Sequence, residues 1–173
     1  TLLGGVIATS TARALAQIAV LDELRFDAMA VTPPYYIPLH AESEFLDYFQ
    51  ACRDAASMRM LAYNIPGFTG SSIPLSALSR MAEQGWIAAV KESSGSRDYF
   101  TQTVELCRRS GVAVMQGHEP HIAWGLALGA AGVVPVCANY EPETFVQAVA
   151  AARQGDQDPL QHAQTRADLV RDT

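Results

Sequence analysis

The sequence has few cysteines, and it has no apolar run of the length that crosses a membrane. Its three cysteines, Cys52, Cys107 and Cys137, form no CxxC pair and show no cysteine–histidine spacing that suits zinc. Free thiols are typical of a reducing compartment, so we expect a cytoplasmic protein without a metal site. A transmembrane helix needs about 20 consecutive apolar residues. No stretch reaches that length, so we expect no membrane partner.

Basic residues are also scarce. The 173 residues include 12 Lys and Arg against 18 Asp and Glu, which gives a net charge of −6 and an isoelectric point near 5.1. No basic cluster exceeds the pair Arg108–Arg109, so nucleic acid is not an expected partner. The chain begins at Thr1 with an apolar run and no basic segment, which is not typical of a signal peptide. Its abrupt start leads us to expect further residues upstream.

Apolar, strand-like runs alternate with segments of helical periodicity along the whole chain. The expected strands are short and cover residues 2–8, 28–32, 59–63, 86–91, 112–116 and 132–138. The expected helices cover residues 11–24, 43–56, 74–84, 98–109, 121–128 and 143–153, with one more after Gly155. These are six βα units without a break in composition, and 49% of the residues are apolar, which suffices for one sizeable core.

Short apolar strands of this kind are typical of a parallel sheet that helices cover. Neither GxGxxG nor a Walker loop follows any strand, so a nucleotide-binding fold lacks its signature. We therefore predict an α/β protein of the (β/α)8 TIM barrel class, with strands 3 to 8 in residues 1–142 and the first two βα units missing. Residues 143–173 would form the last barrel helix and the start of a C-terminal helical extension that is cut short. A six-stranded doubly wound sheet is the alternative.

Polar residues stand at the carboxyl ends of the expected strands, where a barrel places its chemistry. Lys91 directly follows the apolar run WIAAV. Burial disfavours the charged form of an amine, and a neutral amine can attack a ketone to form a Schiff base. A phenol such as Tyr63 or Tyr35 can move the proton when a bond beside a hydroxyl breaks. The alternatives are a solvated Lys91 paired with Glu92 and tyrosines that only pack.

Three motifs in this order, VTPPYY, YNIPGFTG and VKESSG, with GAAGVVPVCAN further on, resemble the dihydrodipicolinate synthase / N-acetylneuraminate lyase family. The resemblance runs from about Gly4 to Asn139. It implies a (β/α)8 barrel that forms a Schiff base with pyruvate or another 2-oxo acid and needs no cofactor or metal. By position, Lys91 would be the Schiff-base lysine and Tyr63 the tyrosine that moves protons and contacts the pyruvate carboxylate. Tyr35 would join the proton relay across a subunit interface.

The resemblance also assigns residues around the substrate. Val134 matches the site on the eighth strand whose backbone lies near pyruvate, and Gly117 opens the seventh-strand loop that lines the pocket. His118 and Glu119 follow in that loop. They could hydrogen-bond a polyhydroxylated acceptor or only cap the loop, and they make an unconvincing metal site.

The sequence departs from the family pattern at three places. Pro34 stands where the family has the first aromatic residue of its TPYY motif, and the GTTGE loop of the second strand is absent, which fits two missing βα units. Phe68 stands where the synthases have an arginine that binds the carboxylate of the aldehyde substrate. A phenyl ring cannot form that bidentate contact, so Phe68 favours a different acceptor unless it only packs under a loop.

We therefore predict a lyase or aldolase that joins or separates pyruvate and an aldehyde, with a 2-keto-3-deoxy sugar acid or a sialic-acid-like compound as substrate. The alternatives are dihydrodipicolinate synthase itself, a dehydratase of keto-deoxy sugar acids, and a ligand-binding relative without turnover. The family implies a homo-oligomer, a dimer or a tetramer. The sequence leaves the aldehyde and the number of subunits open.

Overall fold

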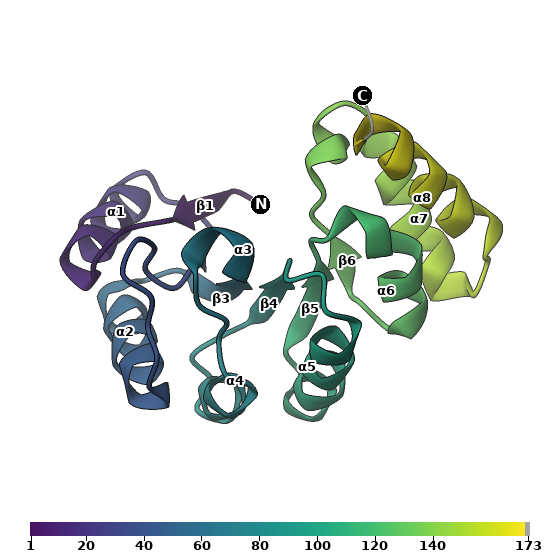
Figure 1. Cartoon of the computed structure of the whole chain (residues 1–173). Helices are drawn as coiled ribbons and strands as arrows, with labels where there is room; N and C mark the ends of the chain where they lie inside the picture. The colour runs from purple at the N-terminus through teal and green to yellow at the C-terminus, as the bar shows by residue number, and fades with distance from the viewer. Residues whose placement is uncertain (172–173) are drawn as a thin grey trace.

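The computed structural model describes residues 1–171 and contains one parallel sheet in that range. Its strands pair with their neighbours in chain order, and they are β1 (Leu3–Val6), β2 (Ala28–Val31), β3 (Arg59–Asn64), β4 (Ala89–Glu92), β5 (Ala113–Gln116) and β6 (Gly132–Val133). A doubly wound sheet reverses its strand order at a switch point. The order here never reverses, so that alternative is wrong and the fold is the curved, parallel-stranded part of a barrel (Figure 1).

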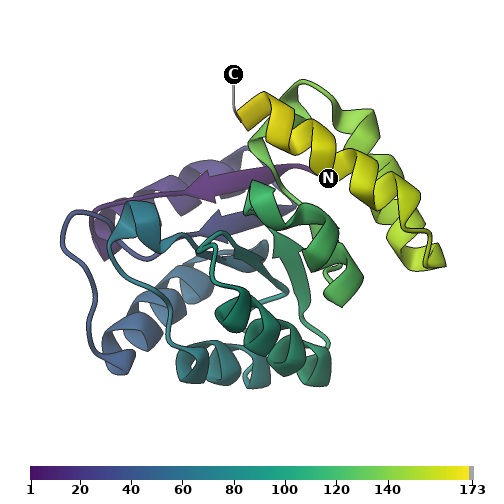
Figure 2. The same cartoon turned by 45° about the vertical axis from the view of Figure 1, so that its right-hand side comes forward.

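The helices lie outside the strands as an arc, apart from the short α3, which lies within that arc, as Figures 1 and 2 show. They are α1 (Thr11–Glu23), α2 (Glu42–Ala55), α3 (Pro66–Thr69), α4 (Leu75–Glu83), α5 (Arg97–Ser110), α6 (Ile122–Leu128), α7 (Pro142–Gln154) and α8 (Asp158–Arg171). Two 3₁₀ turns, η1 (Glu119–His121) and η2 (Val136–Asn139), precede α6 and α7. Apart from the single turn of α3, each helix was predicted from its periodicity. No helix in residues 1–171 is long and apolar enough to cross a membrane.

Local signals explain where the helices begin and end. Ser10 and Ser96 stand just before α1 and α5, and each hydroxyl accepts a hydrogen bond from a backbone N–H in the first turn. Gly111 follows α5 with φ of +68°, a left-handed conformation that glycine adopts without strain. These caps fix the short connections and therefore the place where the next strand starts.

The buried apolar residues form two clusters. The larger one, which we call the sheet core, lies between the sheet and helices α1, α2, α4 and α5. Its fully buried members include Met29, Phe45, Met60, Leu78 and Phe100. The smaller one, the helical cluster, joins α6, η2, α7 and α8. It consists of Ile122, Leu126, Cys137, Phe145, Ala148, Ala151, Leu160, Ala163 and Ala167.

The last strand is much shorter than predicted. We expected a strand over residues 132–138, but β6 ends at Val133 and residues 136–139 form η2. Pro135 precedes that turn and has no N–H to give to a ladder. The Cys137 N–H instead donates to the Glu119 carboxylate at 2.8 Å. The expectation is wrong for residues 134–138, because the chain turns into η2 after Pro135 and its N–H groups leave the ladder with β5.

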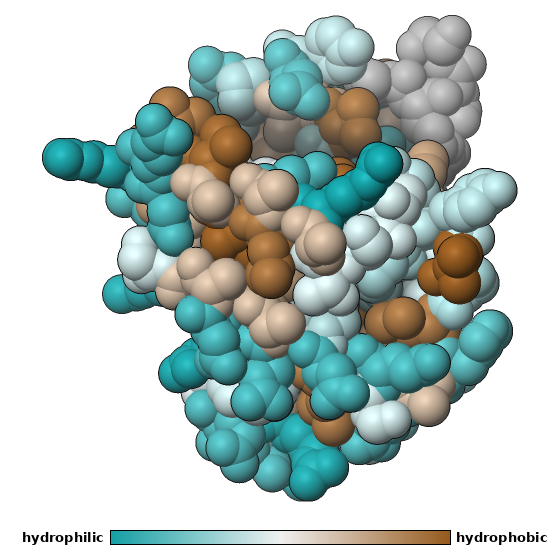
Figure 3. Space-filling view, turned by 90° about the vertical axis from the view of Figure 1, so that its left-hand side faces the viewer, coloured by the Kyte–Doolittle hydropathy of each residue, from teal (hydrophilic) through white to brown (hydrophobic). Residues whose placement is uncertain are grey.

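The side of the molecule that carries β1 exposes apolar residues. Leu3, Ile7, Val20 and Leu24 are all more than two-fifths exposed, and they come from β1, from the segment that follows it and from α1. Figure 3, which looks at this side, shows a patch of hydrophobic residues among hydrophilic ones. β1 has a partner only on its β2 side within the described chain, so this patch borders an open edge of the sheet.

Candidate active site

Lys91 and Tyr63 face each other at the ends of two neighbouring strands. They are partners in the parallel register of β3 and β4, and the Lys91 Nζ lies 4.0 Å from the centroid of the Tyr63 ring. Both side chains are half-buried. No salt bridge in residues 1–171 joins Lys91 to Glu92. The amine and the phenol therefore lie on one face of the sheet, at a distance typical of a cation–π contact.

Lys91 is the only lysine of the sequence, since the other eleven of the 12 Lys and Arg residues are arginines. A guanidinium stays protonated and does not act as a nucleophile, whereas an amine can. The one side-chain amine of the sequence therefore lies at the end of a strand, where it contacts a tyrosine.

Gly117, at the end of β5, leaves room for this lysine. A Cβ at position 117 would lie 3.1 Å from the Lys91 Cε, 3.1 Å from the Glu92 carbonyl oxygen and only 2.1 Å from the Ser93 Oγ. The Gly117 N–H also donates to that Glu92 carbonyl at 2.8 Å. A side chain at position 117 would therefore displace the lysine or its strand.

The Ser93 hydroxyl is a feature that sequence reasoning missed. Its Oγ is buried and has no hydrogen-bond partner among the described residues, although it lies beside the lysine side chain across Gly117. A buried hydroxyl without a partner is costly. Nothing in the sequence distinguishes Ser93 from Ser94, because only the packing of β5 against β4 shows which of the two is enclosed.

A cavity of about 310 Å³ opens next to Tyr63. Apolar side chains make up most of its wall, and its lining residues are Ile7, Thr32, Tyr35, Tyr63, Ile65, Phe68 and Thr69. Tyr35 is 40% exposed and Phe68 is 83% exposed, so both rings stand at the mouth. The structure thus brings together three of the predicted site residues, Tyr35, Tyr63 and Phe68, and no arginine lies in the wall.

The other predicted residues do not line this cavity, and among them Lys91 reaches it only through its contact with Tyr63. The Glu119 carboxylate accepts the Cys137 N–H at 2.8 Å and so caps η2, which is the loop-capping alternative. The His118 ring packs against Gly95 and lies 4.8 Å from the His121 ring, centroid to centroid. Val134 is 37% exposed, and its N–H donates to the Gln116 carbonyl.

Neither the histidines nor the cysteines form a metal site. No group of three or more His, Cys, Asp or Glu residues in the described part of the chain could hold an ion. Burial, with smaller contributions from His118 and Arg97, lowers the pKa of His121, which favours the neutral ring at neutral pH. Burial raises the pKa of Cys52 and of Cys107 to about 11, so these thiols are poor nucleophiles.

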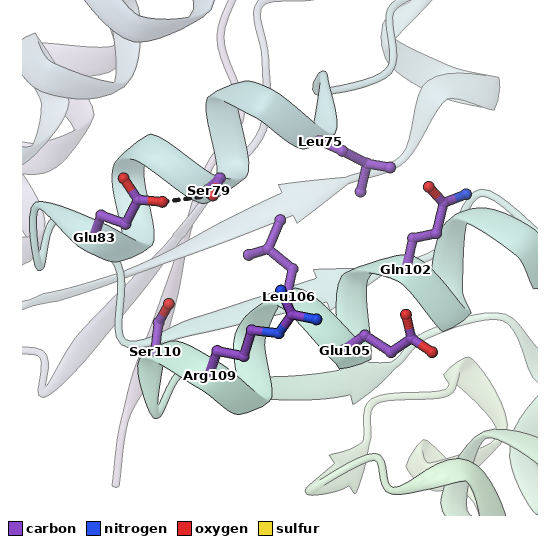
Figure 4. Close-up of a pocket in the computed structure, with 8 residues that line it drawn as sticks. All are labelled: Leu75, Ser79, Glu83, Gln102, Glu105, Leu106, Arg109 and Ser110. Carbon is purple, nitrogen blue, oxygen red and sulfur yellow. Dashed lines mark hydrogen bonds between the residues drawn. The ribbon is translucent and has the colours of Figure 1, made fainter.

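A second cavity, of about 340 Å³, lies between α4 and α5 and is separate from this site (Figure 4). Its wall carries charged groups of both signs, including Glu83, Glu105 and Arg109. The Ser79 hydroxyl, also in the wall, donates a hydrogen bond to the Glu83 carboxylate at 2.8 Å. All its lining residues belong to the two helices, so it has no access to the carboxyl ends of the strands.

Comparison with known proteins identifies the family of the chain. A model of the dihydrodipicolinate synthetase family matches residues 1–172. The 4-hydroxy-tetrahydrodipicolinate synthase of Anaeromyxobacter dehalogenans is 31% identical over 154 residues, which are 89% of this chain and 52% of the relative. The chain thus spans about half the length of the curated relatives it matches.

Solved structures show the same fold. The dihydrodipicolinate synthase of Thermotoga maritima superposes with a TM-score of 0.87 at 21% identity, over 94% of this chain and 56% of its own. The 2-keto 3-deoxygluconate aldolase of Picrophilus torridus gives 0.83 at 23% identity, over 94% and 58%. With the family match across nearly the whole sequence, these findings show that the chain belongs to the dihydrodipicolinate synthetase family.

Proposed function

We propose that this protein is a class I lyase or aldolase in which Lys91 forms a Schiff base with pyruvate or with a substrate that contains it. The observation that carries the proposal is the contact between the sole lysine and Tyr63 at adjacent strand ends, with Nζ 4.0 Å from the ring centroid. The family match and the cavity beside Tyr63 support it.

The chemistry begins at the amine. Lys91 Nζ attacks the C2 carbonyl of a 2-oxo acid, and loss of water gives an iminium. Tyr63 takes the proton of the C4 hydroxyl, with Tyr35 at the same cavity as its relay partner. The C3–C4 bond then breaks, its electron pair moves into the iminium to give an enamine, and an aldehyde leaves. Protonation at C3 and hydrolysis release pyruvate and the free amine.

The acceptor aldehyde is proposed to come from a 2-keto-3-deoxy sugar acid or a sialic-acid-like compound. The supporting observation is Phe68 at the mouth of a cavity without an arginine, because an aldehyde with its own carboxylate needs a cationic partner. His118, Glu119, Gly117 and Val134 would line the far side of a larger substrate. The names of the curated relatives favour the second candidate, the condensation of pyruvate with aspartate semialdehyde.

We further propose that the active protein contains two more βα units, which precede β1 and pair with its open edge. At the other end of the barrel, the helical extension that starts within residues 143–173 would be longer. The apolar patch along the β1 edge and the greater length of the relatives support the added units. We also propose a homo-oligomer. Tyr36 and Ile37, which follow Tyr35, are 88% and 69% exposed, and two apolar side chains at a loop tip favour contact with a second copy.

Reductive trapping tests the central step. Incubation with pyruvate and borohydride should add one reduced pyruvate unit, and peptide mapping should place it on Lys91. Lys91→Arg, which keeps the charge, should take up none. An unmodified protein at saturating pyruvate would contradict the proposal. The remaining alternative would then be a ligand-binding relative without turnover.

A substrate panel then identifies the acceptor. The rate at which the protein releases pyruvate from keto-deoxy sugar acids should exceed the rate at which it consumes pyruvate in the presence of aspartate semialdehyde. Release of the intact carbon chain without pyruvate would identify the dehydratase. Growth of a synthase-deficient strain without lysine, restored by this protein, would favour the second candidate.

A further inference from the structure

A buried polar pair stands directly behind the lysine and the tyrosine. Asn64 follows Tyr63, Glu92 follows Lys91, and the two are partners in the next step of the β3–β4 register. Successive side chains of a strand point to opposite faces. Asn64 is fully buried and Glu92 is 1% exposed, and the Asn64 Nδ2 donates to the Glu92 Oε1 at 3.1 Å. We call these two residues the backing pair.

The environment of Glu92 makes its presence costly. No salt bridge reaches its carboxylate from any residue in the described range. Its carboxylate instead accepts hydrogen bonds from two neutral donors, the Asn64 amide and the Ser94 N–H, the latter at 2.7 Å. Burying a carboxyl group without a cation loses solvation that hydrogen bonds only partly restore. An apolar residue would fill the same space at less cost if packing were the sole requirement.

Glu92 and the residues next to it hold the chain just beyond the lysine. Its side chain holds the Ser94 N–H, just after β4, and its carbonyl accepts the Gly117 N–H of β5 at 2.8 Å. The Ser93 N–H donates to the Asn64 carbonyl at 2.9 Å. The end of β4 is therefore tied to both neighbouring strands one step beyond Lys91.

Asn64 extends these constraints to the cavity wall. Its Oδ1 accepts the Ile73 N–H at 2.9 Å, which closes the loop of residues 65–73 that carries Phe68. The Tyr99 hydroxyl donates to the Ile73 carbonyl at 2.6 Å. Burial raises the pKa of Tyr99, so this hydroxyl remains a donor. One connected set of hydrogen bonds thus joins the lysine strand, the tyrosine strand and the mouth of the cavity.

We propose that Glu92 is a positioning residue, which acts through Asn64 and Ser94 to hold the Lys91 amine over the Tyr63 ring in the geometry that imine formation requires. The inference rests on the proposed function of Lys91 and adds a residue to it. Reactive groups displaced by about 1 Å can lose roughly a hundredfold in rate. Loss of the backing pair should therefore lower the rate of imine formation and kcat, and change the KM for pyruvate little.

The test compares three variants of the protein. Glu92→Ala removes the acceptor, and Glu92→Gln keeps an oxygen that can accept from Asn64 and Ser94. Leu160→Ala is the control for lost stability, because Leu160 is only 2% exposed and belongs to the helical cluster, which contains none of the residues bonded to the backing pair. Borohydride trapping with pyruvate measures the rate of imine formation, and thermal unfolding measures stability.

E92A should trap pyruvate at least about tenfold more slowly than the wild type. E92Q should stay within about threefold of the wild type, which is rescue by the conservative variant. L160A should trap at the wild-type rate even if its stability falls as far as that of E92A. In a double-mutant cycle of Glu92→Ala with Asn64→Ala, the double variant should trap pyruvate no more slowly than the slower of the two single variants. Equal rates in E92A and L160A, or an E92Q as slow as E92A, would overturn the proposal.

A crystal structure of E92A gives a readout that does not depend on catalysis. The distance from the Lys91 Nζ to the centroid of the Tyr63 ring should increase from 4.0 Å, or the lysine should adopt more than one conformer. If wild-type protein is not trapped, the proposed function is contradicted, and this distance still decides the inference. An unchanged distance with a single conformer would overturn the inference alone.

Discussion

The sheet core and the helical cluster bury apolar residues equally well, but they organise polar groups differently. In the sheet core, the ladder from β1 to β5 fixes each strand end to within one residue, and the candidate amine, phenol and backing pair all stand at such ends. In the helical cluster, β6 has only two residues, and the contacts are between helices. Apolar packing gives both regions stability, whereas a precise polar arrangement requires the ladder.

Replacement of Lys91 should give the largest effect and should separate function from stability. Lys91→Arg and Lys91→Met remove the only amine side chain, so kcat/KM should fall at least about a thousandfold. Lys91 is half-buried, so the free energy of unfolding should change by less than about 1 kcal/mol. Steady-state kinetics and urea unfolding measure the two quantities. Substantial turnover in K91R would contradict the imine mechanism.

Matched leucine truncations test whether the two clusters serve different roles. Leu78 in the sheet core and Leu160 in the helical cluster are 0% and 2% exposed. Leu78→Ala should lower the free energy of unfolding by about 4 kcal/mol, and Leu160→Ala by about 2 kcal/mol, because α8 lies at the surface and can move into the space.

At a temperature where both variants are folded, only L78A should slow the trapping of pyruvate. Urea unfolding and borohydride trapping provide the comparison. An L160A that loses trapping to the same extent would show that the helical cluster also positions the lysine.

A methyl group at position 117 should disturb the site without a large loss of stability. Gly117→Ala places a Cβ against Ser93 and the Lys91 Cε, so imine formation should slow by about tenfold. Gly5→Ala is the matched control, since a Cβ there would meet only the Ile7 Cδ1 at 4.0 Å. Trapping rates measured on both variants decide the matter, and equal rates would mean that the strand ends adjust to the added methyl.

The smallest expected effect concerns the attachment of α8 at low pH. The hydrogen bond from Arg166 holds the pKa of Glu141 below its usual value of 4.5. A carboxyl group whose pKa is lower in the folded state stabilises the fold above its unfolded pKa, and this contribution is lost as the pH falls through the folded value.

The thermal midpoint should therefore drop more between pH 6 and pH 3, roughly, in the wild type than in Glu141→Gln. Differential scanning calorimetry at the two values measures the difference. Identical drops would mean that this exposed ion pair contributes nothing to stability.

Much of the site could be predicted because it depends on local signals. The apolar run before Lys91 and the position of Tyr63 placed both residues at strand ends, and apolar periodicity placed the helices. The backing pair could not be found in this way, since a glutamate at the end of a predicted strand is most often exposed to solvent. The enclosure of Ser93 and the short β6 were equally hidden, because each depends on a neighbouring segment that is distant in sequence.

The sequence by itself determined the alternation of strands and helices, the position of the sole amine at a strand end, and the family, because periodicity, caps and motifs are properties of short segments. Only the tertiary structure decided that Lys91 lies over Tyr63 rather than beside Glu92, and that Glu92 turns inward to Asn64. The physical reason is register. A shift of β4 by one residue against β3 would exchange the faces of Lys91 and Glu92 and separate both from their partners on β3, and long-range packing of the sheet against its helices fixes that register.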